Sequence, residues 1–380
     1  MRKFLSMFAI VALCGLAFVS CSDDDDTTPP PPPEPTPVTV TEGVFLLNSG
    51  NSANYVDGSL TYFGADGSTT PNAFSTANGR SLGLTPNDII TFGQKMYIVV
   101  TDENTIEVVD KNTLKSIKQI KTTDLMGTDR GTQPRHITAA GNHVYVSTFR
   151  GYVAAIDTVN FEMAAVYQVG SFPEGMAASG NSLYVVNSDY GNGVNPSISI
   201  IDLNTGNVTE QNDELIMNPT AIAEANGALY FLDYGKYDNN WNQTDAGVRK
   251  VANGEITKVA DATMMAVNPT AGLIYTVNAP YSSAGVTITY NVYNTTTGEL
   301  RTFIDGSGID SPAAIGVDPV TGSVFIASYR MNADTGYADY AANGYVRVYN
   351  ADGTFVREDE AGVGPIAFAF NHNTYDVVNE

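Results

Sequence analysis

The sequence predicts an all-β fold, and three observations lead to this prediction. A short apolar motif with one aromatic residue recurs along most of the chain. A proline-led run and a turn rich in glycine and asparagine precede this motif, as in "FPEGMAASGNSLYVVN" at residues 172–187. Such turn residues accept positive φ. No apolar pattern of helical period is long enough to compete, so short strands joined by turns are expected.

The aromatic strand recurs six times at intervals of 39 to 50 residues. Its aromatic positions are Tyr97, Tyr145, Tyr184, Tyr230, Tyr275 and Phe325. After it come a gap of variable length, a third strand such as "SISIID" (197–202), a second turn and a fourth strand. Four short strands in a unit of about 40–50 residues are the pattern of a β-propeller blade.

The two ends of the repeat array are incomplete in complementary ways. Six complete units run from about Pro86 to Gly362. Residues 43–78 lack a proline-led first strand, whereas "GPIAFAFN" (364–371) supplies a first strand alone. Joined together, the two fragments make one blade and remove an open sheet edge. The sequence therefore predicts a seven-bladed β-propeller over residues 43–380, closed by the C-terminal strand joining the N-terminal blade.

One unit, "LYVVN…ISIIDLNTGNV" (183–208), resembles the repeat of the YVTN-type, YncE-like β-propellers. In that family a strand ends in Tyr-Val-x-Asn, the next ends in Ile-Asp, and a Thr-Gly turn follows. The resemblance covers nearly all of residues 43–373. It implies the propeller fold but little about activity, because one fold carries many unrelated functions.

Residues 1–20 look like a secretory signal peptide. Arg2 and Lys3 form a basic start, and residues 4–19 are almost wholly apolar. The stretch "AFVSC" (17–21) resembles a bacterial lipobox, which implies cleavage before Cys21 and lipidation of its sulfur. A chance cysteine at a cleavage site is the alternative. Cys14 would leave with the signal peptide, so the mature chain could form no internal disulfide.

Residues 21–42 are expected to be a lipidated cysteine followed by an acidic, proline-rich tether. The stretch "SDDDDTTPPPPPEPTP" (22–37) cannot bury a core. Its prolines favour extended polyproline II, in which residues 29–37 span roughly 28 Å. The acidic run resembles the surface-export signal of Bacteroidetes lipoproteins, which implies an outer-membrane protein facing the cell exterior. A simple solvated spacer is the alternative, and it leaves the membrane leaflet open.

The charge balance argues against nucleic acid and anionic lipid surfaces as ligands. The chain has 41 acidic and 19 basic residues and a formal net charge of −22. Both ligands require a basic footprint, which this composition does not offer.

Strand order predicts that the longest loops lie on one face of the propeller, here called the top face. It carries the loops between the second and third strands and the loops that enter each first strand. The opposite bottom face carries the short turns between strands one and two and between strands three and four. The second-to-third-strand loops are residues 49–58, 101–104, 148–151, 188–197, 233–247, 279–285 and 329–344.

Large aromatic residues are concentrated in these top loops. They are Tyr55, Phe149, Tyr190, Tyr234, Tyr237, Trp241, Tyr281, Tyr329, Tyr337 and Tyr340, with Arg150 and Arg330 among them. Tyr and Trp offer flat contact area and a polar handle at little cost in entropy. A single ring is explained more simply by packing on its neighbour, but ten rings on one face favour a binding surface.

The entrance of the central channel is the other place to seek chemistry. The residues expected there are Asn87, Asp88, Arg135, His136, Glu174, Thr220, Met264, Ala313 and Ile366. Asp88, His136 and Glu174 are of types that ligate metals, but the residues facing them are not. Polar channel lining is therefore favoured over a metal site, and a binding protein without a cofactor over an enzyme. The alternative is a metal-dependent, lactonase-like hydrolase.

The anchor, the tether and the loop placement together are similar to the BtuG-type surface lipoproteins of gut Bacteroidetes. That resemblance implies capture of cobalamin or another corrinoid and its transfer to a TonB-dependent outer-membrane transporter. The residues predicted to hold the ligand are Asp88, Arg135, Phe149, Arg150, Tyr190, Tyr234, Tyr237, Trp241, Tyr281, Tyr329 and Arg330. A glycan- or protein-binding propeller, such as an adhesin or accessory protein, would use the same aromatic loops and stays open.

Overall fold

The computed structural model describes residues 35–188, 195–282 and 285–377. The predictions for Cys21 and Tyr190 lie outside the described residues. The chain separates into a unit of Thr39–Tyr375, described below, and a unit of Met1–Val38 with Asp376–Glu380. None of the helices in the described part of the chain is long and apolar enough to cross a membrane.

The described residues form seven four-stranded sheets and one two-stranded sheet. Three sheets are β4 (Pro86–Phe92), β5 (Lys95–Val100), β6 (Thr105–Asp110) and β7 (Ser116–Lys121); β8 (Pro134–Ala140), β9 (His143–Thr148), β10 (Tyr152–Asp157) and β11 (Met163–Gln168); and β12 (Pro173–Ser179), β13 (Ser182–Asn187), β14 (Ser197–Asp202) and β15 (Val208–Gln211). Three more are β16 (Pro219–Ala225), β17 (Ala228–Asp233), β20 (Gly247–Ala252) and β21 (Glu255–Ala260); β22 (Met264–Asn268), β23 (Leu273–Asn278), β24 (Thr289–Asn294) and β25 (Leu300–Ile304); and β26 (Ser311–Val317), β27 (Val324–Tyr329), β28 (Asn343–Tyr349) and β29 (Phe355–Val363).

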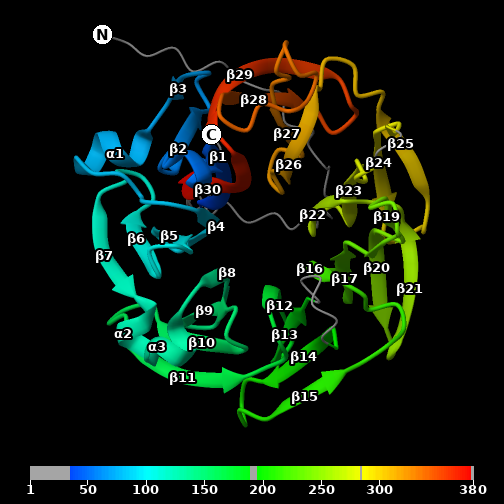
Figure 1. Cartoon of the computed structure of the whole chain (residues 1–380). Coiled ribbons are helices and arrows are strands. Elements are labelled where there is room, and N and C mark those ends of the chain that lie inside the picture. Colours follow the sequence, from blue (N-terminus) through cyan, green and yellow to red (C-terminus); the bar gives the residue numbers. More distant parts are fainter. Residues whose placement is uncertain (1–34, 189–194, 283–284, 378–380) are drawn as a thin grey trace, which may run out of the picture. The chain divides into compact units, whose positions relative to one another are not determined.

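The remaining four-stranded sheet combines both ends of the repeat array. It orders β30 (Pro365–Val377), β1 (Thr36–Asn48), β2 (Ser59–Gly64) and β3 (Thr69–Thr70). The two-stranded sheet pairs β18 (Lys236–Tyr237) with β19 (Gln243–Thr244) inside one top loop. Figure 1 shows the first strands β4, β8, β12, β16, β22 and β26 on the inner side, and the fourth strands β7, β11, β15, β21 and β25 on the outer side.

Apolar layers between neighbouring sheets form the core, because each sheet presents apolar side chains on both of its faces. Tyr97 of β5 packs with Val144 and Val146 of β9, and Tyr145 of β9 packs with Val185 of β13. The recurring aromatic residues of the second strands therefore mark the core, and Tyr97 is fully buried. Tyr184 is the exception, since its ring is only half-buried.

A β-bulge follows the leading proline in five first strands. The register shifts lie just after Pro86, Pro134, Pro173, Pro219 and Pro312. A bulge leaves residues unpaired, bends the strand and redirects its side chains. The bulged positions include six of the residues that the sequence places at the channel entrance: Asn87, Arg135, His136, Glu174, Thr220 and Ala313.

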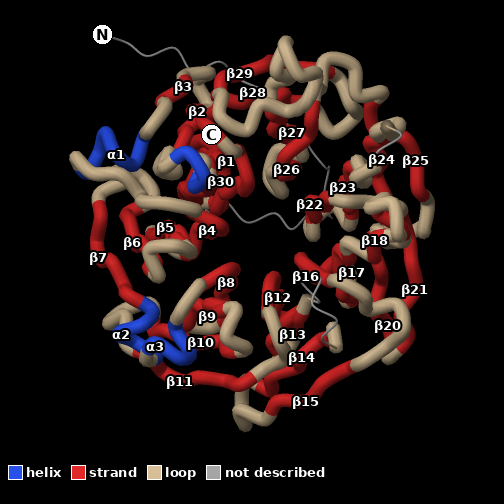
Figure 2. The backbone as a smooth tube through the Cα atoms, in the orientation of Figure 1, coloured by secondary structure: helices blue, strands red, loops and turns tan. Residues whose placement is uncertain are grey.

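Three short helices depart from the all-strand expectation. They are α1 (Ala73–Asn78), α2 (Thr122–Met126) and α3 (Thr128–Gly131), and each lies in a connection from a fourth strand to the next first strand. Figure 2 shows them among the strands, together with the 3₁₀ turn η1 (Ser52–Asn54). Each is too short to show a helical period in the sequence.

Strand β1 begins at Thr36, inside the segment that the sequence assigns to the tether. Likewise, β30 continues to Val377, beyond the predicted first strand at 364–371. Both strands extend past β2, whose pairing with β1 begins at Gly43. Hydrogen bonds join the extended parts, including Thr39 Oγ1 with Thr374 Oγ1 at 2.9 Å.

Removing the ring of Phe325 is expected to lower the free energy of unfolding by about 3–5 kcal/mol. Phe325 is 4% exposed, and its ring packs against Phe368 and Phe370 of β30 at centroid distances of 5.9 and 5.8 Å. Urea unfolding of Phe325→Ala would measure the change. Phe355→Ala is the matched control, because Phe355 is 47% exposed, and it should cost under about 1 kcal/mol. Equal losses in the two variants would contradict this assignment of the core.

Candidate functional site

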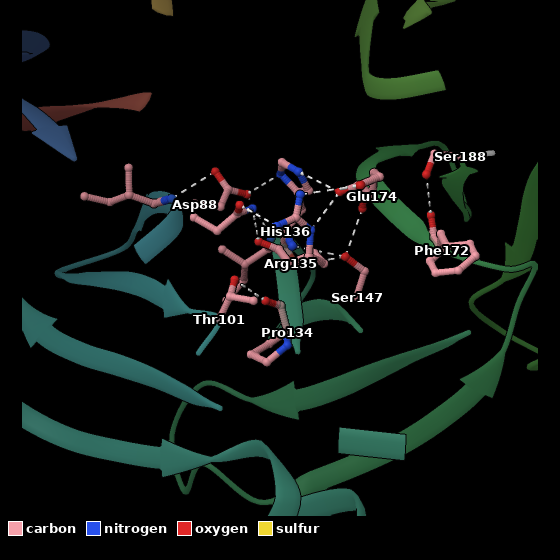
Figure 3. Close-up of polar contacts among 12 residues, drawn as sticks. Asp88, Thr101, Pro134, Arg135, His136, Ser147, Phe172, Glu174 and Ser188 are labelled. Atoms are coloured by element: carbon pink, nitrogen blue, oxygen red, sulfur yellow. Dashed lines mark hydrogen bonds and ion pairs between the residues drawn. The ribbon is translucent and has the colours of Figure 1, made fainter. Parts of the chain in front are cut away.

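Four charged side chains from three first strands form an ion network at the channel entrance (Figure 3). His136 lies between two carboxylates, with Nδ1 3.2 Å from Asp88 Oδ2 and Nε2 3.3 Å from Glu174 Oε2. Arg135 Nε donates to the same Glu174 oxygen at 3.0 Å. The bulge after Pro134 allows adjacent residues of β8 to join one network, and the network links β4, β8 and β12.

Arg135 makes three further contacts, two with Asn87 and one with Phe149. Its Nη1 donates to Asn87 Oδ1 at 2.8 Å, and its carbonyl oxygen accepts from Asn87 Nδ2 at 2.7 Å. Its guanidinium carbon lies 4.3 Å from the centre of the Phe149 ring. Phe149 in turn packs edge-on against Phe172. Arg135 and Asp88, predicted to meet a ligand, are thus engaged with other protein groups, and their ligand role stays a prediction.

The network keeps His136 protonated through neutral pH. Burial alone would lower the pKa of its imidazole, but the charge and hydrogen bond of Asp88, together with those of Glu174, raise it to about 9. The positive imidazolium lies between the carboxylates of Asp88 and Glu174, and Glu174 is only 4% exposed. A cation shared between the buried Glu174 and the partly buried Asp88 is therefore part of the folded structure.

A metal would have to compete with this arrangement. Asp88, His136 and Glu174 are the residue types that ligate zinc or calcium, yet both ring nitrogens of His136 already face carboxylates. Within the described ranges, no three His, Cys, Asp or Glu residues are grouped so that they could hold a metal ion. The site chemistry is therefore that of an ion-paired surface between three sheets.

Exposed aromatic side chains lie on two neighbouring top loops and form what is here called the aromatic patch. Its members, with their exposed fractions, are Tyr234 (37%), Tyr237 (49%), Trp241 (71%) and Tyr281 (62%). The ring centres of Tyr237 and Trp241 are 6.4 Å apart. Burial, followed by the charges of Glu174 and Tyr237, raises the pKa of Tyr234, so the patch adjoins the ion network.

Backbone hydrogen bonds fix the two loops to each other. The amide of Gln243 donates to the carbonyl of Tyr281 at 2.8 Å, and the Tyr281 amide donates to Gln243 Oε1 at 3.1 Å. Asp238 Oδ1 accepts from the amides of Asn240 and Asn242, which closes the turn that carries Trp241. Trp241 has φ of 63°, a left-handed conformation that costs about 1 kcal/mol or more for a bulky residue. The structure therefore holds an apolar ring outward in a strained turn.

A buried ion pair lies under this loop. Asp233 and Arg249 are both fully buried, and Arg249 Nη1 lies 3.8 Å from Asp233 Oδ1. Asp233 accepts hydrogen bonds from the amides of Asn218 and Gly235, while Arg249 donates to the carbonyl oxygen of Asp245. Both ends of the 233–247 loop are thus fixed by two charges that have no access to water.

Tyr329 and Arg330 belong to a separate group on the 329–344 loop. The Tyr329 ring packs edge-on against Tyr340 at 4.8 Å. Arg330 lies 4.9 Å above the Tyr345 ring, and its Nη2 donates to Glu360 at 2.7 Å. Asn51 Nδ2 donates to the carbonyl of Tyr340, which fixes this loop to the neighbouring top loop. The structure therefore divides the predicted site residues among different sheets.

Phe149 and Arg150 line a small hollow of about 200 Å³ together with Phe172 and residues 168–171. Arg150 is exposed there, so among the predicted arginines it is the one most open to a ligand.

The sequence did not identify Asp233 and Arg249 as residues that position the site. A signal was present in the repeat: Asp233 ends an aromatic strand where other units have Asn48 or Asn187. Both asparagines are buried, and the Asn187 amide donates to Ser197 and Ser199 at 2.9 Å. This position fastens a top loop to its own sheet.

Comparison with known protein families assigns the chain to one of them. The protein-family model described as "Domain of unknown function (DUF5074)" matches residues 42–362 of the sequence. The chain belongs to this family. No curated protein sequence matches this DUF5074 chain.

Several solved structures are similar to this DUF5074 chain in fold. Hydrazine synthase of Kuenenia stuttgartiensis aligns with a TM-score of 0.56 at 16% identity, covering 77% of this chain and 96% of that chain. A Bacteroides uniformis ATCC 8492 protein named as a candidate 6-phosphogluconolactonase aligns with a TM-score of 0.58 at 13% identity. The alignment covers 87% of this chain and 100% of that chain. The WD40 repeats of RRP9 align with a TM-score of 0.51 at 8% identity, and the alignment covers 74% of this chain and 81% of that chain. At such identities the likeness extends to the fold alone, and it supports a β-propeller.

Substituting Asp233 is expected to destabilise the protein strongly. Asp233→Ala would leave the Arg249 charge buried and unpaired, which typically costs about 3–5 kcal/mol. Urea unfolding would give the loss. Asp261→Ala is the control, because Asp261 pairs with Lys258 at 2.6 Å while its own side chain is 72% exposed. Such an exposed pair contributes at most about 1 kcal/mol. A loss for Asp233→Ala no larger than the control would disprove the role of the buried pair.

The pH dependence of stability should report on His136. Its pKa is about 9 in the folded state against an ordinary value of 6.5, so its stabilisation is complete below pH 6.5 and is lost as the pH rises through 9. Unfolding at several pH values should show a loss of up to about 3 kcal/mol across this window. His136→Gln, which cannot titrate, should give a flatter profile. A profile identical to that of the unaltered protein would refute the assignment.

Proposed function

We propose that this protein is a binding protein that captures a large, flat, polar-edged nutrient, cobalamin or another corrinoid, on its top face. The observation that carries the proposal is the aromatic patch. Its four rings are exposed, two loops fixed to each other carry them, and one ring occupies a strained turn. Contiguous exposed apolar patches mark binding surfaces, and backbone strain of this kind clusters at functional sites.

The chemistry of a corrin fits this surface. The macrocycle offers flat apolar faces for Tyr237, Trp241 and Tyr281, and its rim carries amides that hydrogen-bond to tyrosine hydroxyls and to the exposed Arg150. The ion network beside the patch has little unpaired charge to offer. A neutral, amide-rimmed ligand therefore suits the site better than an anion, in keeping with the net charge of −22.

The proposed binding surface is part of a seven-bladed ring closed by β30. Apolar clusters support this arrangement, because they link each four-stranded sheet with the next along the chain and also link the sheet of β1 with those of β4–β7 and β26–β29. The presence of β30 and β1 in one sheet supports the closure. Such a closure completes the first sheet with an inner strand, and the outer fourth strands remain as short edges.

We further propose that Cys21 is lipidated and anchors the protein at the outer membrane, facing the exterior, where it passes its ligand to a TonB-dependent transporter. Within the unit Thr39–Tyr375, β1 starts on the bottom face, where Glu42 lies beside Gln94 and Asn112 in the turns of the neighbouring sheet. The aromatic patch lies on the loops of the opposite, top face.

The non-lipidated chain of residues 22–380 should bind cyanocobalamin. After mixing and desalting, corrin absorbance is expected to elute with the protein, and titration calorimetry would give the affinity. Trp241→Ala should weaken binding at least about 30-fold, since a buried aromatic anchor contributes about 2 kcal/mol or more. Phe355→Ala, which removes an exposed ring on the bottom face, should leave affinity unchanged.

Corrin absorbance that stays wholly with the small molecules would overturn the cobalamin assignment. Binding that survives Trp241→Ala would instead remove the ligand from the aromatic patch. In the first case, binding of a glycan or peptide that is sensitive to Trp241→Ala would keep the patch as the site and change only the ligand.

A further inference from the structure

A second concave surface lies on the bottom face, at the opposite ends of the strands from the top loops. Its volume is about 520 Å³, and it is lined by Glu42, Tyr62, Gln94, Asn112, Asn371, Asn373, Thr374 and Tyr375. The lining comes from the extended ends of β1 and β30, from Tyr62 of β2 and from two turns of the neighbouring sheet. This surface, here called the amide groove, combines carboxamide side chains with tyrosine rings.

Asn112 is the centre of the groove. Its Oδ1 accepts from Asn371 Nδ2 and from Asn373 Nδ2, both at 3.2 Å, and its Nδ2 donates to Gln94 Oε1 at 3.1 Å. Four carboxamides are therefore fixed in orientation by one another. A set of polar groups held in place in this way loses little conformational entropy when a ligand binds.

The network leaves hydrogen-bonding capacity at the rim of the groove. Asn371 is 3% exposed, yet its Oδ1 has no hydrogen-bond partner among the described residues. Asn371 Oδ1 is covered by the protein, so it is not open to a ligand. Gln94 uses its oxygen within the network, which leaves its Nε2 as a donor at the exposed rim. The groove thus presents a donor at its edge, beside the Glu42 carboxylate.

Charge and ring placement narrow the ligand class. Glu42 is the only charged residue among those lining the groove, and it already accepts from the Tyr375 hydroxyl at 2.7 Å, so an anion is disfavoured. Hydroxyl groups both donate and accept through one atom, which matches the mixed set of amides. The Tyr375 ring is 50% exposed and can cover an apolar C–H face.

We propose that the amide groove binds a neutral oligosaccharide. Sugar hydroxyls would donate to Glu42 and accept from Gln94 Nε2, while a sugar face packs on Tyr375. The groove volume suits a few sugar residues. This site is separate from the aromatic patch and does not depend on what the patch binds.

The test is titration calorimetry of residues 22–380 with maltotriose, cellotriose, xylotriose and mannotriose. At least one trisaccharide is expected to bind with a Kd of 1 mM or tighter. Asn112→Ala should weaken it at least about tenfold, because it removes the residue that orients the other amides. Gln94→Ala, at an exposed position where folding should be unaffected, should also weaken it, by about threefold or more.

Asn204→Ala is the matched control. Asn204 is exposed, and its amide donates to Asp202 two residues earlier, just as that of Asn112 donates to Asp110. The same substitution in an equivalent turn of another sheet should leave sugar binding unchanged. The proposal is overturned if none of the four trisaccharides binds, or if binding is indifferent to both Asn112→Ala and Gln94→Ala. Cyanocobalamin binding, measured separately, reports on the aromatic patch and not on this groove.

Discussion

The pairing of β30 with β1 is the constraint on which the rest of the structure depends, because it joins the last strand of the chain to the first sheet. Hydrogen bonds extend this junction beyond the strands: the amide of Ser49 donates to the Gly364 carbonyl at 2.7 Å, and the amide of Gly362 donates to Asn48 Oδ1 at 3.1 Å. Lys111 of the neighbouring sheet reaches the carbonyl of His372. Several sheets are thereby positioned by one terminal strand.

The two faces built on this framework use different means to hold polar groups. At the channel entrance, bulges bring Arg135, His136 and Glu174 from adjacent first strands into a network that satisfies its own charges. The aromatic patch stands on a loop whose ends are fixed by the buried Asp233–Arg249 pair. On the bottom face, carboxamides orient one another around Asn112. The charged side chains thus stabilise the framework through ion pairs, whereas the neutral rings and carboxamides remain available to contact a ligand.

The repeat made the strands and their grouping predictable, because an aromatic strand such as Leu183–Asn187 and a Gly-Asn turn are local features of the chain. The polar partners were not predictable, since the meeting of Asp88 with His136 depends on a bulge and on the approach of two sheets. The start of β1 at Thr36 was missed because the composition of this stretch is that of a tether, and its pairing with β30 is a long-range effect. The amide groove was missed for a similar reason, since residues far apart in sequence build it.

The continuation of β1 beyond its partner β2 also has a mechanical consequence. A force applied at Thr39 along the axis of β1 acts on an inner member of a four-stranded sheet. Because β1 is bordered by β2 on one side and by β30 on the other, such a force acts as shear on two rows of hydrogen bonds at once. Breaking them requires many bonds to fail together, whereas a strand peeled from an edge loses them one at a time. The position of β1 between two partner strands therefore favours resistance to a force along its axis.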